Sequence, residues 1–259
     1  MLRETLDNGI VRYRFETLDQ KDMVHAILTR LGGVSRGPFA TLNLGHTVGD
    51  DLEAVEENHR RVFAALGLRR DRVVSPYQVH SANVRWVSDA HAGTVQPATD
   101  GLITDTPGLV ILFRFADCVP VLLFDRAHRA IGLVHAGWRG AAKGIVTAAV
   151  RAFVRHIGSR PEELWAGIGP AIGPCCYRVG SDVARAVARA CPADVPIAHR
   201  RDGGVYLDLP GAVRAQLVAS GVGEVETSGI CTACHTGEWF SHRAERGRTG
   251  RFGVVMMLQ

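Results

Sequence analysis

Three residues whose side chains can bind a metal ion lie at the expected ends of buried strands. They are His80 in SPYQVHSANV, Cys118 in RFADCVPVLLF and His135 in IGLVHAGWRG. Two imidazoles and one thiolate form a three-ligand set for zinc, and a catalytic zinc ion keeps its fourth position open for water or substrate. Because the three positions are far apart in the sequence, a buried thiol with two ordinary histidines remains the alternative.

The residues that follow His135 favour a binding pocket at this point of the chain. In the segment HAGWRG, Gly137 and Gly140 permit close approach of the backbone as the strand ends. Arg139 lies between them and offers a planar guanidinium group that can bind an anion through two hydrogen bonds.

The Cys118 and His135 pair also supports a different chemistry. An imidazole can activate a thiolate nucleophile, as in cysteine hydrolases. The sequence does not separate this interpretation from metal binding, although the buried-looking strand around Cys118 argues slightly against an exposed nucleophile.

Two arginine-containing segments are further candidates for anion binding. The first, TRLGGVSRGPFATLNLG, places Arg30 and Asn43 in a turn-rich loop whose backbone N–H groups can cradle an anion, but a surface loop punctuated by glycines fits the same pattern. The second, WFSHRAERGRTGR, holds Arg243 and three more arginines, and such a run usually forms a solvated face.

Two motif-like segments are interpreted without a cofactor. CTACH, which starts at Cys231, matches the pattern of c-type haem attachment, but that attachment requires export, so we interpret Cys231 and Cys234 as unattached thiols. GIGPAIG has its third glycine one place too late for a dinucleotide-binding loop, and prolines interrupt any helix start. A rigid turn is therefore predicted there.

The composition indicates a globular protein and excludes several classes. With 46% hydrophobic and 22% charged residues among 259, the chain is neither disordered nor fibrous. A formal net charge of +4 does not demand a nucleic-acid partner. No apolar stretch approaches the roughly 20 residues of a membrane span. Because the first residues lack the apolar core of a secretion signal, we expect a cytoplasmic protein whose six cysteines are reduced.

The elements expected to position the candidate residues are short buried strands and amphipathic helices. Strands are predicted at 110–115, 119–125, 130–135, 225–230 and 252–258. Helices are predicted at 141–156, 183–190 and 209–220, and from Asp50, as a possible N-cap, to a stop at Gly67. Without a regular βαβ repeat, this order favours the α+β class. With no linker or internal repeat, we expect a single domain spanning residues 1–259.

Nearly the whole chain resembles the YfiH family, long described as laccase-domain or multicopper polyphenol oxidases and now associated with purine nucleoside metabolism. The resemblance depends on seven motifs in series: TRLGGVSRGPFATLNLG, QVHSANV, TDGLITD, ADCVPVLL, VHAGWRGAAKGI, GIGPAIGPCCYRV and SHRAERGRTGR. It implies an α+β fold in which mixed sheets are layered between helices, in the order α/β/β/α.

The resemblance also implies site residues and substrates. The metal ligands are then His80, Cys118 and His135, usually with zinc, while Arg30, Asn43 and Arg243 match pocket positions. The implied activities are phosphorolysis of adenosine, inosine and S-methyl-5′-thioadenosine, with deamination of adenosine. The implied partners are therefore a purine nucleoside and phosphate. One departure is His242, at a position where the family commonly has tyrosine.

These activities need a proton carrier and an anion site. We select Asp117, beside Cys118, as the candidate carrier; a carboxylate that orients a ligand histidine is an equal alternative. Arginine donors, with Arg139 among them, would hold phosphate against the positive charge that develops at the sugar. The runner-up functions are a Cys118/His135 amide hydrolase that edits peptidoglycan precursors, a polyphenol oxidase with copper in the same site, and a metal-binding regulator without activity.

The histidines argue against multicopper chemistry. A four-copper arrangement uses about ten histidines, many in H-x-H pairs. The eleven histidines of this chain include no such pair. A single copper ion can still occupy a Cys/His₂ site, because copper binds such ligands more tightly than zinc.

Overall fold

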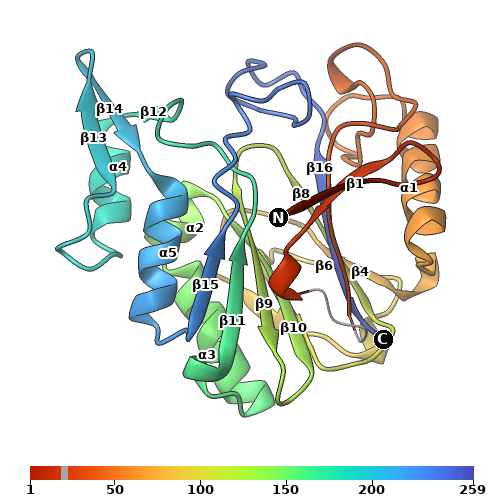
Figure 1. Cartoon of the computed structure of the whole chain (residues 1–259), viewed down its shortest axis with the longest axis horizontal. Helices are drawn as coiled ribbons and strands as arrows, with labels where there is room; N and C mark the ends of the chain where they lie inside the picture. Colours follow the sequence, from red (N-terminus) through yellow and green to blue (C-terminus); the bar gives the residue numbers. More distant parts are fainter. Residues whose placement is uncertain (19–22) are drawn as a thin grey trace.

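The structure is a computed structural model that describes residues 1–18 and 23–259. Two large mixed β-sheets pack face to face, and helices cover the outer side of each (Figure 1). The layers therefore follow the order α/β/β/α, which confirms the predicted α+β class and layering. In the described part of the chain, no helix combines the length and apolar character needed to cross a membrane.

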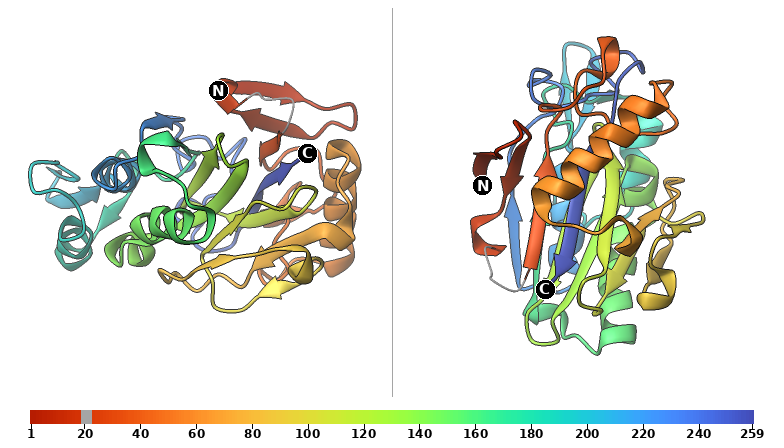
Figure 2. Two further views of the ribbon diagram at one scale, coloured as in Figure 1. Left: turned by 90° about the horizontal axis from the view of Figure 1, so that it is seen from below. Right: turned by 90° about the vertical axis from the view of Figure 1, so that its right-hand side faces the viewer.

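The first sheet has seven strands, and α1 (Leu52–Leu66) covers its outer face. In the right-hand view of Figure 2, α1 faces the viewer. In spatial order its strands are β1 (Leu2–Thr5), β2 (Val11–Arg14), β3 (Met23–Leu28), β16 (Phe252–Leu258), β8 (Val110–Phe115), β4 (Val73–Pro76) and β6 (Val95–Gln96). Strand β4 pairs parallel with both of its neighbours, whereas the other pairs are antiparallel.

The second sheet has six strands and lies against the other helices. In spatial order its strands are β15 (Glu224–Thr227), β11 (Leu164–Ile168), β9 (Val119–Asp125), β10 (Ala130–Ala136), β7 (Gly101–Thr104) and β5 (Val84–Trp86). The helices on this side are α2 (Trp138–Ala142), α3 (Ile145–Ile157), α4 (Ser181–Ala188) and α5 (Leu209–Ala219). A small third sheet lies beside α4 (Figure 1). In spatial order its strands are β12 (Arg178–Val179), β14 (Gly204–Leu207) and β13 (Ala198–Arg201).

Three hydrophobic cores separate the four layers. In β8, Leu112 points toward α1, and its neighbours Ile111 and Phe113 point into the core between the sheets. In β9, Leu122 points into that same core, while Val121 points toward the helices. These strands are buried on both faces, which is why they appear in the sequence as continuous apolar runs rather than as an alternating pattern.

The predicted strands and helices occur with small shifts at their ends. Strands β8, β9 and β16 have the predicted bounds, and β10 extends one residue further, to Ala136. Strand β15 ends at Thr227, three residues before its predicted end. The predicted 183–190 helix is α4, which begins earlier at Ser181, and α5 ends at Ala219.

Two local predictions were wrong. The N-cap of α1 is Asp51, whose side chain accepts from the Glu53 N–H, while Asp50 accepts from Ser35 instead. The single helix predicted at 141–156 is interrupted at Gly144, which has φ +75° and separates α2 from α3. Glycine adopts this left-handed conformation without steric cost, so the chain can turn there before the second helix starts.

The link between β8 and β9 carries the chain from one sheet to the other. Residues 116–118 form this link, with β8 in the seven-stranded sheet and β9 in the six-stranded sheet. Groups attached to this link therefore lie at the end of the interface between the two sheets.

Candidate active site

The three candidate metal ligands lie together at this end of the two sheets. The ligand atoms of His80, Cys118 and His135 are all within 4.8 Å of one another. His80 Nε2 lies 3.8 Å from Cys118 Sγ, and the two imidazole rings are 4.9 Å apart at their centroids. Residues distant in the sequence thus form one cluster.

Strand pairing accounts for the position of Cys118 and His135. In the antiparallel register of β9 and β10, His135 lies opposite Pro120, so Gly137 comes next to Cys118. A Cβ atom on Gly137 would lie 2.7 Å from His80 Cδ2 and 3.0 Å from Cys118 Sγ. Only glycine leaves room for the two ligands to approach the backbone here.

A buried carboxylate, Asp100, orients the histidines of the cluster. It immediately precedes β7, whose pairing with β10 places it beside His135. Its Oδ1 accepts a hydrogen bond from His135 Nδ1 at 2.9 Å, which directs the other ring nitrogen of His135 toward the cluster. Contacts of this kind fix the ring orientation of a metal-binding histidine and increase its basicity.

The same carboxylate determines the backbone conformation of His80. The N–H groups of Val79, His80 and Ser81 all donate to Asp100, at 3.2, 3.0 and 2.7 Å, and the Ser81 hydroxyl donates at 2.7 Å. His80 has φ +59°, a conformation that side-chain-bearing residues rarely adopt. The convergence of these donors on one anion compensates for the strain of that turn.

Burial and hydrogen bonding act in opposite directions on the charge of Asp100. Burial alone would raise the pKa of this carboxyl, because its side chain has no solvent exposure. Hydrogen bonds from His135 and Ser81 outweigh burial and hold the pKa well below its usual range. The carboxylate therefore stays ionised.

Cys118 and His135 form a thiolate–imidazolium pair when no metal ion is bound. Burial opposes a charge on Cys118, but the positive charge and hydrogen bond of His135 outweigh it and lower the thiol pKa to about 6. Burial likewise opposes a charge on His135, but the Cys118 thiolate and Asp100 raise the imidazole pKa to about 9. Both groups are charged between these two pH values.

This donor set fits a borderline-soft cation. Removal of the His135 proton leaves one thiolate and two neutral imidazoles, a combination that suits zinc or copper. Three protein ligands leave a coordination position available for a substrate or water. The cavity next to the cluster provides the space for either.

A cavity of about 850 Å³ opens on the cluster, and its lining is positively charged. Three aromatic side chains contribute to the lining, namely Tyr77, Trp138 and Tyr177. Four arginines also line it, namely Arg114, Arg139, Arg243 and Arg251. Asp117 is the single acidic side chain among the described residues of the lining.

Two of these arginines are partly buried and have no carboxylate partner among residues 1–18 and 23–259. Arg114 donates to the Leu44 carbonyl at 2.6 Å, and Arg251 donates to the carbonyls of Thr249 and Gly250. Burial lowers the pKa of Arg114 to about 10 and also lowers that of Arg251. A guanidinium group desolvated in this way gains stability when an anion binds nearby.

The other two arginines were selected from the sequence. Arg139 is exposed and stacks on the Trp138 ring at 4.4 Å. Arg243 lies over the Tyr177 ring at 5.0 Å, and its backbone N–H donates to Asp117. Both line the cavity, as does His242.

Arg30 lies outside the set of residues that line the cavity. Its guanidinium group donates to the carbonyls of Ala40 and Thr236 and to Glu245, and it stacks on Phe240 at 4.4 Å. These contacts join the N-terminal loop to the C-terminal segment. In this arrangement the donors of Arg30 are directed at the protein, and its contact with a ligand stays a prediction.

Asn43 also supports the wall rather than lining the cavity. Its side chain has no solvent exposure and accepts hydrogen bonds from the N–H groups of Gly45 and Arg251, both of which line the cavity. The amide thus positions two lining residues, and its direct contact with a ligand stays a prediction.

Asp117 lines the cavity but does not orient His135. It accepts hydrogen bonds from the Thr232 and Ser241 hydroxyls, each at 2.7 Å, and from the Arg243 N–H at 2.6 Å. The carboxylate beside the ligand histidine is Asp100, so that alternative for Asp117 was wrong. Its role as a proton carrier stays a prediction.

Asp100 and Arg114 are the main site residues that sequence reasoning missed. TDGLITD contains Asp100, but only the pairing of β7 with β10 places this residue beside His135. Arg114 lies within an apolar strand that sequence reasoning treated as core. The charged residue inside this apolar run could have identified Arg114 as a site residue, since arginine is rarely buried without a partner for its charge.

The comparisons with known proteins agree with the motif resemblance. A family model described as "Multi-copper polyphenol oxidoreductase laccase" matches residues 24–259. The chain is 40% identical over 239 residues to a Geobacillus stearothermophilus protein named purine nucleoside phosphorylase YlmD, covering 88% of this chain and 87% of that protein. It is also 40% identical over 234 residues to a Deinococcus radiodurans protein named purine nucleoside phosphorylase, covering 90% and 88%.

A solved structure extends this likeness to the fold. The crystal structure of YlmD from Geobacillus stearothermophilus superposes with a TM-score of 0.93 at 36% identity, covering 99% of this chain and 98% of that one. The resemblance deduced from the seven motifs is therefore confirmed.

Substitution of Asp100 by asparagine tests its role in the cluster. Asn places an NH₂ group where Asp100 accepts from N–H donors, so Asp100→Asn should weaken zinc binding about 10- to 100-fold in a competition titration with a chromophoric chelator. Asp105→Asn is the matched control, since exposed Asp105 accepts from Trp86 with one oxygen and Asn retains that bond. Equal zinc affinity in the Asp100→Asn and control variants would show that Asp100 does not organise the ligands.

Proposed function

The chain belongs to the multi-copper polyphenol oxidoreductase laccase family, and on that premise we propose that it is a purine nucleoside phosphorylase. Phosphate attacks the anomeric carbon of the sugar, the bond from this carbon to the purine nitrogen breaks, and the products are the free base and a pentose 1-phosphate. The observation that carries the proposal is the placement of four arginines and the His/Cys cluster around one cavity.

The arginines supply the phosphate-binding half of the proposed site. None of the four forms an ion pair with a carboxylate within the described residues, so their charges are available to an anion. Arg139 and Arg243 are exposed and can meet an incoming phosphate, whereas Arg114 and Arg251 lie deeper in the wall. Guanidinium groups match phosphate oxygens through paired hydrogen bonds.

The aromatic side chains supply the nucleoside-binding half. Tyr77 is 63% exposed at the cavity and is available for stacking on a purine ring. The volume of about 850 Å³ accommodates a nucleoside together with phosphate, since ligand pockets span roughly 300–1,000 Å³.

We propose zinc as the metal held by His80, Cys118 and His135, with copper as the other ion that suits these ligands. When bound, zinc supplies Lewis acidity that activates water and polarises substrate oxygens. This chemistry underlies the further proposal that the same cavity deaminates adenosine at C6. The proposed substrates for phosphorolysis are adenosine, inosine and S-methyl-5′-thioadenosine.

Asp117 is the proposed proton carrier. It is the acidic side chain among the described residues of the cavity lining, and its neighbour Cys118 belongs to the metal-ligand cluster. The leaving purine needs a proton as its bond to the sugar breaks, and a carboxylate within reach of the cavity can take a proton from the protonated phosphate and pass it to the purine. The hydroxyls of Thr232 and Ser241 hold this carboxyl in place.

Removal of a proposed metal ligand tests the function directly. His80→Ala should lose one zinc ion per chain and reduce the release of hypoxanthine from inosine in phosphate buffer to background. Base release is measured by chromatography, with and without phosphate, and metal content by mass spectrometry. His156→Ala, an exposed histidine on α3, is the matched control and should keep both. Full phosphate-dependent turnover by His80→Ala would refute the proposed metal role.

Arg139 tests the phosphate half without a risk to folding, because its side chain is exposed and stacks on the Trp138 ring without bracing another element of the described chain. Arg139→Ala should raise the KM for phosphate about tenfold, since a hydrogen bond to a charged group contributes about 1.5–3 kcal/mol. The KM for inosine should stay within about twofold. Arg151→Ala, on the exposed side of α3, provides the control. An unchanged phosphate KM would remove Arg139 from the phosphate site.

A second candidate function is favoured by one observation. The spatial arrangement matches the catalytic groups of cysteine hydrolases. Cys118 corresponds to the nucleophile, His135 to the base and Asp100 to the carboxylate that orients the base. This is the peptidoglycan-precursor amide hydrolase of the sequence analysis. It requires an acyl adduct on Cys118 that forms in chelator-treated protein and does not depend on phosphate, whereas phosphorolysis requires phosphate.

The oxidase alternative has less support. Among the described residues, His80 and His135 are the only histidines found in a group able to hold a metal ion. One ion in this group could be copper, but the described residues offer no arrangement for a four-copper centre.

The charge state of Cys118 predicts how the reactivity of this thiol depends on pH in metal-stripped protein. Because its pKa is lowered to about 6, the thiolate persists above that pH and is lost as the pH falls through it. The rate of alkylation by iodoacetamide, followed by peptide mass spectrometry, should therefore be half-maximal near pH 6. Cys191 is the internal control, because burial raises its pKa. A midpoint for Cys118 near 9, the value of an ordinary thiol, would contradict the proposed ion pair.

A further inference from the structure

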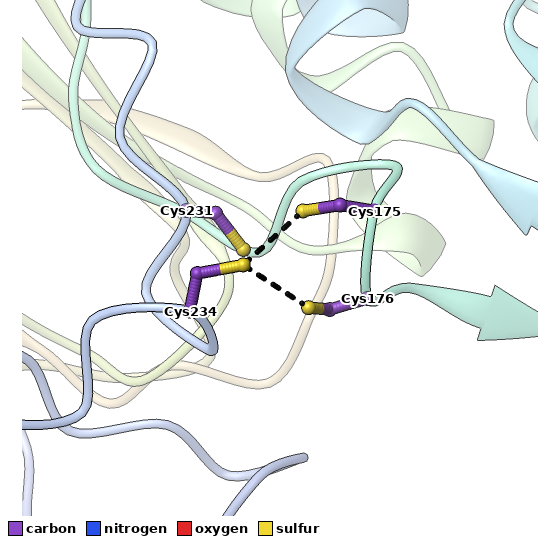
Figure 3. A group of neighbouring side chains, drawn as sticks. All are labelled: Cys175, Cys176, Cys231 and Cys234. Atoms are coloured by element: carbon purple, nitrogen blue, oxygen red, sulfur yellow. Dashed lines mark hydrogen bonds between the residues drawn. The ribbon is translucent and has the colours of Figure 1, made fainter.

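Four of the six cysteines form a second cluster that contains no histidine. The sulfur atoms of Cys175, Cys176, Cys231 and Cys234 all lie within 4.8 Å of one another. Cys234 Sγ is 3.5 Å from Cys175 Sγ and 3.4 Å from Cys176 Sγ. Figure 3 shows the four side chains pointing toward one another from two separate loops.

We propose that these four cysteines bind a structural zinc ion as a tetrathiolate site. A tetrahedral zinc ion with Zn–S bonds of about 2.3 Å requires sulfur atoms about 3.8 Å apart. The two shortest contacts of Cys234, at 3.4 and 3.5 Å, and the upper limit of 4.8 Å for the whole set are compatible with that value. A disulfide would need about 2 Å, and all four cysteines are free thiols here.

The all-sulfur composition of this cluster indicates which metal ions it can bind. Thiolates are soft ligands that favour zinc, copper(I) or iron over magnesium and calcium. A set of four thiolates around one ion indicates zinc or iron, and sulfur atoms that all lie within 4.8 Å of one another leave no room for a cluster of several iron ions. We commit to zinc, which needs no redox partner and is the usual ion of closed structural sites.

Neighbouring strands bring the two loops together. Strands β11 and β15 are parallel partners, and each is followed by one of the two cysteine pairs. Parallel strands end at the same edge of a sheet, so both loops leave from that edge. Beyond the strands, an isolated bridge pairs Ala171 with Cys231, and the Thr232 N–H donates to the Ala171 carbonyl.

Backbone hydrogen bonds prepare the loops for thiolate ligands. The Gly173 N–H donates to Cys231 Sγ at 3.2 Å. The N–H groups of Cys176 and Tyr177 both donate to the Gly173 carbonyl, so this turn directs the adjacent cysteines toward the opposite loop. N–H donation to sulfur favours the charged form of a thiol, which is the form that binds a metal ion.

The proposed zinc ion would stabilise one wall of the cavity that opens on the His80, Cys118 and His135 cluster. Tyr177 follows Cys176 directly and lines that cavity. Thr232, between the other two cysteines, donates to Asp117, which also lines it. Zinc binding would therefore fix the position of both groups. This inference does not depend on the proposed function, because it concerns a separate set of ligands.

The test separates the two metal sites by working in a Cys118→Ala background. Chains are expressed with zinc, purified under reducing conditions, and measured for zinc and iron by mass spectrometry. Cys118→Ala should retain one zinc ion per chain, and Cys118→Ala/Cys234→Ser should retain none. Cys118→Ala/Cys234→His should regain it, since histidine also binds zinc. Cys118→Ala/Cys191→Ser is the matched control, because Cys191 lies outside both clusters, and should retain one.

A second measurement reports the ligands themselves. Cobalt substituted into Cys118→Ala should give the intense visible absorption of a tetrahedral thiolate complex, and this absorption should be lost in Cys118→Ala/Cys234→Ser. If the serine variant does not fold, a titration takes the place of that variant. Folded Cys118→Ala is titrated with a mercurial reagent, which binds the thiolates and should release one zinc ion per chain.

The inference is overturned if folded Cys118→Ala holds no zinc, holds iron instead, or keeps its zinc in the Cys234→Ser background. An intact mass that shows disulfides within the four cysteines of reduced-purified Cys118→Ala would also overturn it. Because all these measurements use zinc content and spectra, loss of phosphorolysis alone would leave the inference unchanged.

Discussion

The cavity cluster depends on the hydrogen bonds of one buried carboxylate. Asp100 accepts from His135, from three successive N–H groups around His80 and from the Ser81 hydroxyl. It thereby joins the start of β7, the loop after β4 and the end of β10. A buried carboxylate without these donors would be strongly unfavourable, so the donors and the acceptor stabilise one arrangement together. The direction of both histidines toward Cys118 follows from that arrangement.

Around this cluster the cavity lining carries more arginine side chains than acidic ones. The link between β8 and β9 presents Asp117 and Cys118 at the end of the sheet interface, and Arg114 reaches the same cavity from β8. Asp117 accepts hydrogen bonds from the Ser241 hydroxyl and the Arg243 backbone N–H, and it is the one acidic side chain among the described residues that line the cavity with four arginines. The cavity is thus electrostatically suited to an anionic ligand.

The interior of the sheets could be predicted from the sequence because local composition determines it. Runs such as 110–115 and 119–125 contain enough apolar and β-branched residues to be buried on both faces, and they form strands with those bounds. Helix ends were less accurate. Asp50 and Asp51 are both suitable N-caps by residue type, and the contact of Asp50 with Ser35 decides between them. The break at Gly144 likewise depends on how α2 and α3 pack against the sheet.

By itself the sequence determined the α+β class, the main strands and the identity of three chemically capable residues, since these follow from residue type and short-range periodicity. Only the tertiary structure decided which side chains meet. It placed Asp100 beside His135 through strand pairing, turned Arg30 and Asn43 toward the protein, and gathered four cysteines from two loops. Contacts between residues distant in the chain depend on register and layer packing, which one-dimensional patterns do not specify.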